Sequence, residues 1–195
     1  MRLFIALDID DAIRERIKRF LEGIRNFAPD ARWVRPESLH VTLKFIGEQP
    51  PEAVDRIKQC LSQVRNGPFE ITFRGHGFFP TARAPRVFWV GIEAGKELAS
   101  LAGNIDKCMH ALGIPKEDHP FSPHLTLARG GKSGSPRRQK GDPPNTKFQP
   151  LQQKLAALPS PEFGTMTARE FFLYQSKMSP GGSQYTKLER FPLGV

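Results

Sequence analysis

Cysteine is scarce in this chain of 195 residues, and its placement excludes several kinds of site. The two cysteines, Cys60 and Cys108, lie 48 positions apart, outside any Cys-x-x-Cys pattern and away from clustered histidines. This spacing argues against a zinc site and against a scaffold built on disulfides. We therefore expect both cysteines to be small buried apolar residues on helices.

Long hydrophobic runs are also missing. No stretch approaches the ~18 consecutive apolar residues that a membrane helix needs, and residues 1–8 are too short for a signal peptide. We expect a cytoplasmic protein with no membrane partner. Hydrophobic residues make up 38% of the chain, which is too many for a disordered segment, and the length fits one domain over 1–195.

Acidic residues are outnumbered by basic ones, with 20 Asp and Glu against 29 Lys and Arg, so the net charge is +9. This balance favours a polyanionic partner, such as RNA or a nucleotide phosphate. The sequence has no acidic cluster that could hold two catalytic metals, no serine-hydrolase elbow and no phosphate loop. We expect no metal and no cofactor.

What the chain does contain is an internal repeat. Residues 36–43 align with 120–127 at an offset of 84, and Gly47 aligns with Gly131 at the same offset. Both copies read Pro-x-Ser-x-His-x-Thr-Leu-x-x-x-Gly. The match indicates that a structural unit has been duplicated.

The second copy is longer than the first. Phe-Phe at 78–79 finds its counterpart at 171–172, where the offset has grown to 93. The added residues fit best in 131–145, a stretch rich in Gly, Pro, Ser and basic residues. The repeat units are therefore expected at about 1–84 and 85–178.

Each unit carries the same coarse elements. Short β-branched and aromatic runs predict strands at 3–7, 39–46, 69–79, 87–92, 123–129, 163–175 and 184–191, the last closing the chain. Apolar residues at steps of three and four predict helices at 11–27, 51–65, 95–112 and 146–158. The pattern predicts an α+β fold, in which duplicated sheet-and-helix units form two lobes related by a pseudo-twofold axis.

The repeat carries a paired His-x-Thr element. Side chains two apart on a strand share a face, so His40 lies beside Thr42 and His124 beside Thr126, with apolar residues on the reverse. If the duplication creates a pseudo-twofold axis, the two polar faces can meet across one cleft. The other histidines have no Thr two positions on and are expected to be ordinary core or surface residues: His76, His110 and His119.

Two histidines facing one cleft suit general acid–base catalysis, because imidazole titrates near neutral pH. One of His40 and His124 would accept a proton while the other donates one. The hydroxyls of Thr42 and Thr126 can donate hydrogen bonds to phosphate oxygens, and Arg129 adds a planar cation suited to phosphate.

These residues resemble the paired His-x-Thr-x motifs of the two-histidine phosphoesterase superfamily, and within it the RNA 2′,3′-cyclic phosphodiesterases, also called 2′-5′ RNA ligase-like. The similar segments cover nearly the whole chain: 2–7, 39–47, 79–80, 86–89, 122–129 and 179–188. The chain departs from the family at 131–145, where the loop is longer and more basic than the family needs.

The resemblance implies a bilobal fold with a central cleft, no metal cofactor, and hydrolysis of a terminal 2′,3′-cyclic phosphate of RNA to a 2′-phosphomonoester. It implies that His40 is the proton donor to the leaving 3′ oxygen and that His124 is the proton acceptor from water. It also implies that Thr42, Thr126 and Arg129 hold the phosphate, and that reversible 2′-5′ ligation is a related activity.

Further substrate contacts follow from the residues alone. Lys44 shares a face with His40 and Thr42 by the period of two and is a candidate for substrate phosphate. Tyr185 is a candidate for stacking on a base, as is the Phe pair at 78–79, although ordinary packing is the simpler role for the pair. The basic stretch around 131–145 could guide RNA or be a solvated loop.

Two alternatives remain open at this point. The same chemistry could act on small cyclic nucleotides or on ADP-ribose cyclic phosphate. The chain could instead be a non-catalytic nucleotide- or RNA-binding module, although both His-x-Thr pairs are intact. Nothing indicates an obligate protein partner, and we expect a monomer.

Overall fold

The computed structural model describes residues 1–130 and 146–194, in which the strands form two antiparallel sheets. The first sheet has the order β3-β1-β8-β9, and its strands are β1 (Arg2–Leu7), β3 (Val41–Glu48), β8 (Glu170–Ser179) and β9 (Gly182–Pro192). The second has the order β2-β6-β5-β4-β7, with β2 (Arg32–Trp33), β4 (Phe69–Phe79), β5 (Val87–Ala94), β6 (His124–Arg129) and β7 (Glu162–Ala168). The basic segment 131–145 lies outside the described residues, so its role as a guide for RNA or as a solvated loop stays a prediction.

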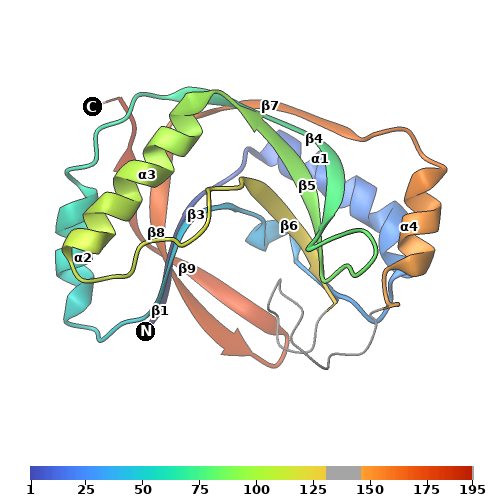
Figure 1. Ribbon diagram of the computed structural model, residues 1–195, viewed down its shortest axis with the longest axis horizontal. Helices are drawn as coiled ribbons and strands as arrows, with labels where there is room; N and C mark the ends of the chain where they lie inside the picture. Colours follow the sequence, from blue (N-terminus) through green and yellow to red (C-terminus); the bar gives the residue numbers. More distant parts are fainter. Residues whose placement is uncertain (131–145, 195) are drawn as a thin grey trace.

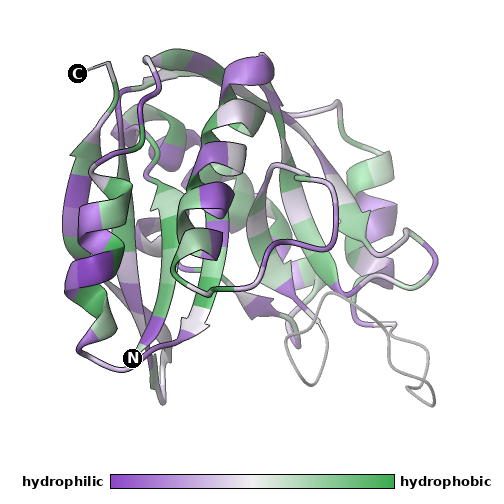
Figure 2. Ribbon diagram, turned by 60° about the vertical axis from the view of Figure 1, so that its left-hand side comes forward, coloured by the Kyte–Doolittle hydropathy of each residue, from purple (hydrophilic) through white to green (hydrophobic). Residues whose placement is uncertain are grey.

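Two helices lie against each sheet, and apolar residues at steps of three and four predict each of them. The helices are α1 (Asp11–Ile24), α2 (Ala53–Leu61), α3 (Lys96–Ala111) and α4 (Gln149–Ala156). Figure 1 shows α2 and α3 together on the left and α1 and α4 together on the right, with β3 and β6 between them. Helix α3 contacts β3, and α1 contacts β7. Hydrophilic and hydrophobic residues are interleaved along the helices (Figure 2). The buried apolar residues of α1 and α3 recur mainly at steps of three and four, so each of these helices turns one apolar side to the interior.

The two lobes match the expected duplication, but they exchange strands. In the first sheet β8, from the second repeat unit, pairs with β1 of the first unit. In the second sheet β4, from the first unit, pairs with β5 of the second. The orders β3-β1-β8 and β6-β5-β4 are therefore equivalent under the pseudo-twofold relation, and each lobe contains parts of both units. This exchange joins the lobes into one molecule.

The strand expected at 163–175 is in fact two strands. β7 ends at Ala168 and pairs with β4 in the second sheet, whereas β8 begins at Glu170 and pairs with β1 in the first. β7 buries Phe163, Met166 and Ala168, and β8 buries the consecutive residues 171–174, so the apolar pattern continues while the chain crosses from one sheet to the other. Periodicity alone could not reveal that crossing, and it also missed β2, which has only 2 residues.

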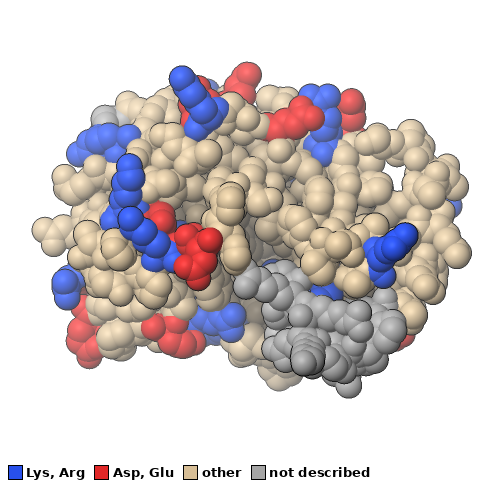
Figure 3. All heavy atoms as spheres, viewed as in Figure 1, with Lys and Arg blue, Asp and Glu red and all other residues tan. Residues whose placement is uncertain are grey.

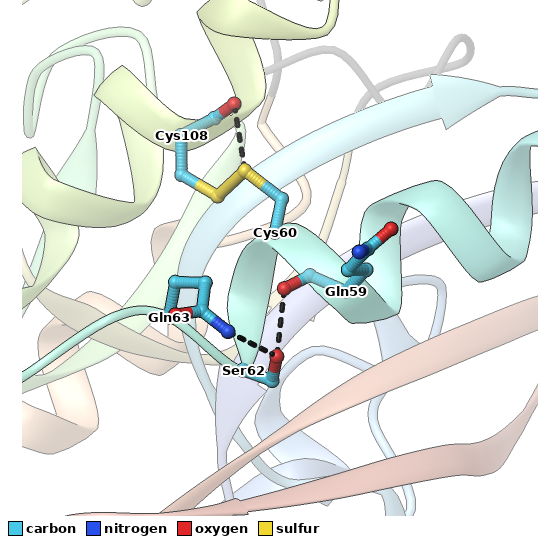
Figure 4. Close-up of a disulfide and its surroundings, with 5 residues drawn as sticks. All are labelled: Gln59, Cys60, Ser62, Gln63 and Cys108. Carbon is cyan, nitrogen blue, oxygen red and sulfur yellow. Dashed lines mark hydrogen bonds between the residues drawn. A yellow bond between two sulfur atoms is a disulfide. The ribbon is translucent and has the colours of Figure 1, made fainter.

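Cys60 and Cys108 form a disulfide, which corrects the expectation that they are only small buried residues. Both lie on helices as expected, near the ends of the adjacent helices α2 and α3, with their Cα atoms 6.0 Å apart (Figure 4). The sequence spacing could not show this, because only helix packing brings the two positions together. Disulfides persist mainly in oxidising compartments and in hyperthermophile cytosol, so the cytoplasmic location stays a prediction. No helix within the described residues is long and apolar enough to span a bilayer.

Candidate active site

The two His-x-Thr elements meet at one cleft. His40 directly precedes β3 and His124 begins β6, and these two strands contact each other across the lobes. The cleft has a volume of about 510 Å³. Its lining residues are Arg2, Phe4, Arg32, Val34, His40, Thr42, Phe45, His124, Thr126, Arg129, Ser176, Met178, Ser183 and Tyr185. The structure thus brings five predicted residues, the two histidines, the two threonines and Arg129, to the same cavity.

Each histidine is held by a backbone carbonyl two residues before it. His40 Nδ1 lies 2.8 Å from the oxygen of Ser38, and His124 Nδ1 lies 2.8 Å from the oxygen of Ser122. A carbonyl can only accept, so each Nδ1–H is the donor and each neutral ring is the Nδ1–H tautomer. Nε2 is therefore the nitrogen that can accept or donate a proton in both rings.

Aromatic rings enclose both imidazoles. Phe4 lies 4.8 Å from His40 between ring centroids, and Tyr185 meets the same imidazole edge-on at 5.2 Å. Phe79 meets His124 edge-on at 4.9 Å. This packing restricts the positions of both imidazole rings.

Burial is the main reason that both histidines have a lowered pKa. For His40, the Ser38 carbonyl and the Asp8 carboxylate oppose the lowering, whereas the positive charge of Arg129 adds to it. For His124, burial and Arg129 again lower the pKa, and the Ser122 carbonyl opposes them. Both imidazoles therefore favour the neutral form more than a histidine in water does.

A register shift in β3 decides which side chains face the cleft. Ala6 of β1 pairs with Thr42, but Ile5 pairs with Lys44, so Leu43 is an extra residue of the β-bulge type. The shift breaks the period of two. Phe45, three residues after Thr42, lines the cleft instead of Lys44.

The expectation that Lys44 shares a face with Thr42 is therefore wrong. Its side chain is only 2% exposed, and its Nζ lies 2.7 Å from Asp106 Oδ1 and 3.3 Å from Glu117 Oε1. It also donates to the carbonyl of Pro115 at 2.7 Å. Lys44 thus ties β3 to α3 and to the segment that follows α3.

The equivalent register shift in β6 brings a predicted phosphate-binding residue, Arg129, to the cleft. Trp89 pairs with Thr126 and Phe88 with Ala128, so Leu127 is the extra residue. After this shift Arg129 lines the same cleft as Thr126, although a strict period of two would place it on the reverse face.

The remaining candidates separate into cleft and core residues. Tyr185 lines the cleft, beside His40. Phe79 packs on His124, whereas Phe78 stacks on Phe88 with ring centroids 5.0 Å apart and so belongs to the core.

The sequence reasoning missed Arg2, Phe4, Arg32 and Phe45. The repeat held a signal for Phe45, because it aligns with Arg129 at the offset of 84.

The site offers two imidazoles with titratable Nε2 atoms, two hydroxyls and a guanidinium, which together can bind a phosphate and move protons on either side of it. Within residues 1–130 and 146–194, no group of three or more His, Cys, Asp or Glu side chains could hold a metal ion.

Comparisons with known proteins show similarity to phosphoesterases. The family model described as LigT like Phosphoesterase matches the chain twice, at residues 7–89 and 90–185. An RNA 2′,3′-cyclic phosphodiesterase of Archaeoglobus fulgidus is 37% identical over 191 residues, covering 98% of this chain and 99% of the relative. One from Methanothermobacter thermautotrophicus is 31% identical and covers 99% of each chain. A crystal structure of E. coli LigT complexed with 3′-AMP is similar with a TM-score of 0.77 and 28% identity, covering 100% of this chain and 98% of that one.

Proposed function

Because the chain belongs to the LigT-like phosphoesterase family, we propose that it hydrolyses the terminal 2′,3′-cyclic phosphate of RNA to a 2′-phosphomonoester. The observation that carries the proposal is that His40 and His124 line one cleft with both Nδ1 atoms held by backbone carbonyls. This arrangement leaves two Nε2 atoms for proton transfer at one phosphate. The printed names of the relatives support the substrate.

In the proposed mechanism, His124 Nε2 takes a proton from water as the water oxygen attacks phosphorus. The bond from phosphorus to the 3′ oxygen breaks, and His40 Nε2–H protonates that oxygen. The hydroxyls of Thr42 and Thr126 and the Arg129 guanidinium stabilise the negative charge that develops on the phosphate oxygens. The product has a free 3′-hydroxyl and a 2′-phosphate.

The electrostatic surroundings support this division of roles. The negative charge of Asp8 raises the pKa of His40 and so partly offsets its burial. The main influences on His124 are burial, the Ser122 carbonyl and Arg129, with no carboxylate among them. The Asp8 carboxylate therefore favours the protonated form of His40, which is what an acid requires, and no carboxylate is among the main influences on His124.

A 5′-hydroxyl can replace water in the same displacement, and the product would then be a 2′-5′ phosphodiester. Because this step uses the same two histidines, we propose the ligation as a side reaction of the hydrolase, favoured when water is scarce and RNA ends are concentrated.

The test is a product analysis. The protein is incubated with EDTA and an oligoribonucleotide that ends in a 2′,3′-cyclic phosphate, and the product end is identified by mass spectrometry and phosphorus NMR. We expect gain of one water and a 2′-phosphomonoester. Binding without turnover would instead identify a non-catalytic module, and a 3′-phosphate product or loss of activity in EDTA would contradict the mechanism.

A further inference from the structure

Three arginine side chains line the cleft, and the proposed mechanism uses only Arg129. Arg2 is the first residue of β1 in the first sheet. Arg32 lies on β2 in the second sheet, directly opposite Arg129 in the antiparallel register. Guanidinium groups from both lobes therefore converge on one cavity.

This convergence has an electrostatic cost. Like charges directly opposite each other on neighbouring strands are destabilising. Burial is the first cause of the lowered pKa of Arg129; the charges of Arg32 and Arg2 lower it further, and Tyr185 opposes them. An anion bound among the three arginines reduces their repulsion, so the arrangement favours anion binding.

The number of positive charges exceeds what one cyclic phosphate needs. A 2′,3′-cyclic phosphate diester carries a single negative charge, and the charge of Arg129 alone already balances it. Arg2 and Arg32 add two further charges in the same cleft. In an oligoribonucleotide the next negative charge is the internucleotide phosphate on the 5′ side of the terminal ribose.

The Arg2 side chain is also suitably placed to donate. Its Cζ lies 5.1 Å from the ring centroid of Phe45, so the guanidinium is held over the ring. A guanidinium over an aromatic face keeps its in-plane N–H donors available for a phosphate. Ser176, the register partner of Arg2 on β8, lines the same cleft and adds a hydroxyl.

The surface in view carries charges of both signs (Figure 3), although the chain has a net positive charge. On the face drawn in Figure 3, the described Lys and Arg side chains are interspersed with Asp and Glu. None of the residues lining the cleft, among those that the structure describes, is acidic. The charged side chains among these lining residues, apart from the titratable histidines, are all arginines.

We propose that Arg2 and Arg32 form a second phosphate subsite that binds the internucleotide phosphate next to the terminal cyclic phosphate. This inference rests on the proposed function. With this subsite, RNA ends of two or more nucleotides are better substrates than nucleoside 2′,3′-cyclic phosphates. The subsite therefore favours RNA over small cyclic nucleotides as the substrate class.

The experiment compares kcat/KM for three substrates: adenosine 2′,3′-cyclic phosphate, the dinucleotide ApA 2′,3′-cyclic phosphate, and the same dinucleotide with a neutral methylphosphonate linkage. The neutral dinucleotide keeps both bases and removes only the second charge. We expect the charged dinucleotide to exceed the mononucleotide by about tenfold, the size of one charge-assisted contact, and the neutral dinucleotide to lose most of that gain.

Substitutions assign the effect to the two arginines. In Arg2→Gln and in Arg32→Gln, the ratio of charged to neutral dinucleotide should fall towards one. Arg190→Gln is the matched control, because Arg190 is an exposed arginine on β9 that pairs with Glu170 and does not line the cleft; its ratio should equal that of the wild type.

The outcomes separate the two proposals. If the wild type hydrolyses none of the three substrates, the proposed function itself is overturned. If it hydrolyses the charged and neutral dinucleotides with equal kcat/KM, or if both arginine variants keep the wild-type ratio, the second subsite is overturned while the proposed function stands.

Discussion

At the scale of single residues, the site depends on two histidines whose tautomers are set by carbonyl groups. The Ser38 and Ser122 carbonyls hold the Nδ1 atoms in the same way, so geometry alone makes His40 and His124 nearly equivalent. The difference between them is electrostatic, because Asp8 influences His40. Kinetic measurements on variants can therefore distinguish the acid from the base, although the two histidines have nearly the same local geometry.

His40→Ala and His124→Ala should each lose about 10²–10⁴-fold in kcat, because each removes one general acid or base. A substrate with a better leaving group at the 3′ position needs less protonation. It should restore His40→Ala much more than His124→Ala when single-turnover rates are compared. His110→Ala, an exposed histidine at the end of α3, serves as the control and should match the wild type. Equal restoration of both variants would reverse the conclusion that His40 is the acid.

The pH dependence of kcat/KM should be bell-shaped, because one imidazole must be neutral and the other protonated. Burial lowers the pKa of both histidines, so the optimum should lie below about 6.5, the pKa of an ordinary histidine. The charge of Arg129 lowers both pKa values further. Arg129→Gln should therefore move the whole profile to higher pH, in addition to lowering its height. A profile that moves to lower pH would show that Arg129 does not act on the histidines in this way.

At the scale of elements, the register shifts in β3 and β6 are the features that make the site. Each shift follows a Thr of the His-x-Thr pair and turns the residue three positions later into the cleft. In β3 that residue is Phe45, and in β6 it is Arg129. The pseudo-symmetric strands thus contribute an aromatic ring on one side and a cation on the other.

Lys44 joins β3 to α3 and its following segment, and its removal should destabilise the protein. Lys44→Met leaves the half-buried carboxylate of Asp106 without its closest cation, and losing one partner of a buried pair costs about 3–5 kcal/mol. Because Asp106 keeps some contact with water, we expect about 2–3 kcal/mol in the free energy of unfolding measured with urea. Lys58→Met, which removes a more exposed lysine paired with Glu189, should cost less than about 1 kcal/mol. Equal losses in the two variants would show that Lys44 contributes no more than a surface pair.

At the scale of the whole molecule, the exchange of strands makes the two lobes interdependent. β4 and β8 each complete the sheet of the other repeat unit, and the disulfide between α2 and α3 joins helices from both units. Neither repeat unit keeps all of its strands in one sheet. We therefore expect the chain to unfold as one cooperative unit.

The stability of the molecule should fall as the pH is lowered from 8 to 5. Burial lowers the pKa of His40, His76 and His124, so the unfolded chain binds more protons than the folded chain just below about 6.5. The contribution of these histidines to stability is complete above about 6.5, the pKa of a histidine in the unfolded chain. It is lost as the pH falls from there through the lower pKa values of the folded protein. Asp8 also has a lowered pKa, but its effect lies below about 4, outside this window.

Urea midpoints measured between pH 8 and 5 check this prediction. His76→Asn removes one of the three groups without touching the cleft, so its midpoint should depend less steeply on pH than that of the wild type. A midpoint that rises on acidification would contradict the assignment of these histidines as buried neutral groups.

The sequence by itself determined the features that depend on local pattern and on the duplication. The repeat, the helix and strand types and the pairing of His40 and His124 with their threonines are all encoded in short periodicities. Tertiary structure decided the rest, because it depends on which distant segment pairs with each strand. The partner of β3 is β1, and only the shifted pairing of Ala6 and Ile5 places Phe45 in the cleft and Lys44 in the interior. The strand exchange, the disulfide and the convergence of three arginines likewise exist only when segments far apart in the sequence are packed together.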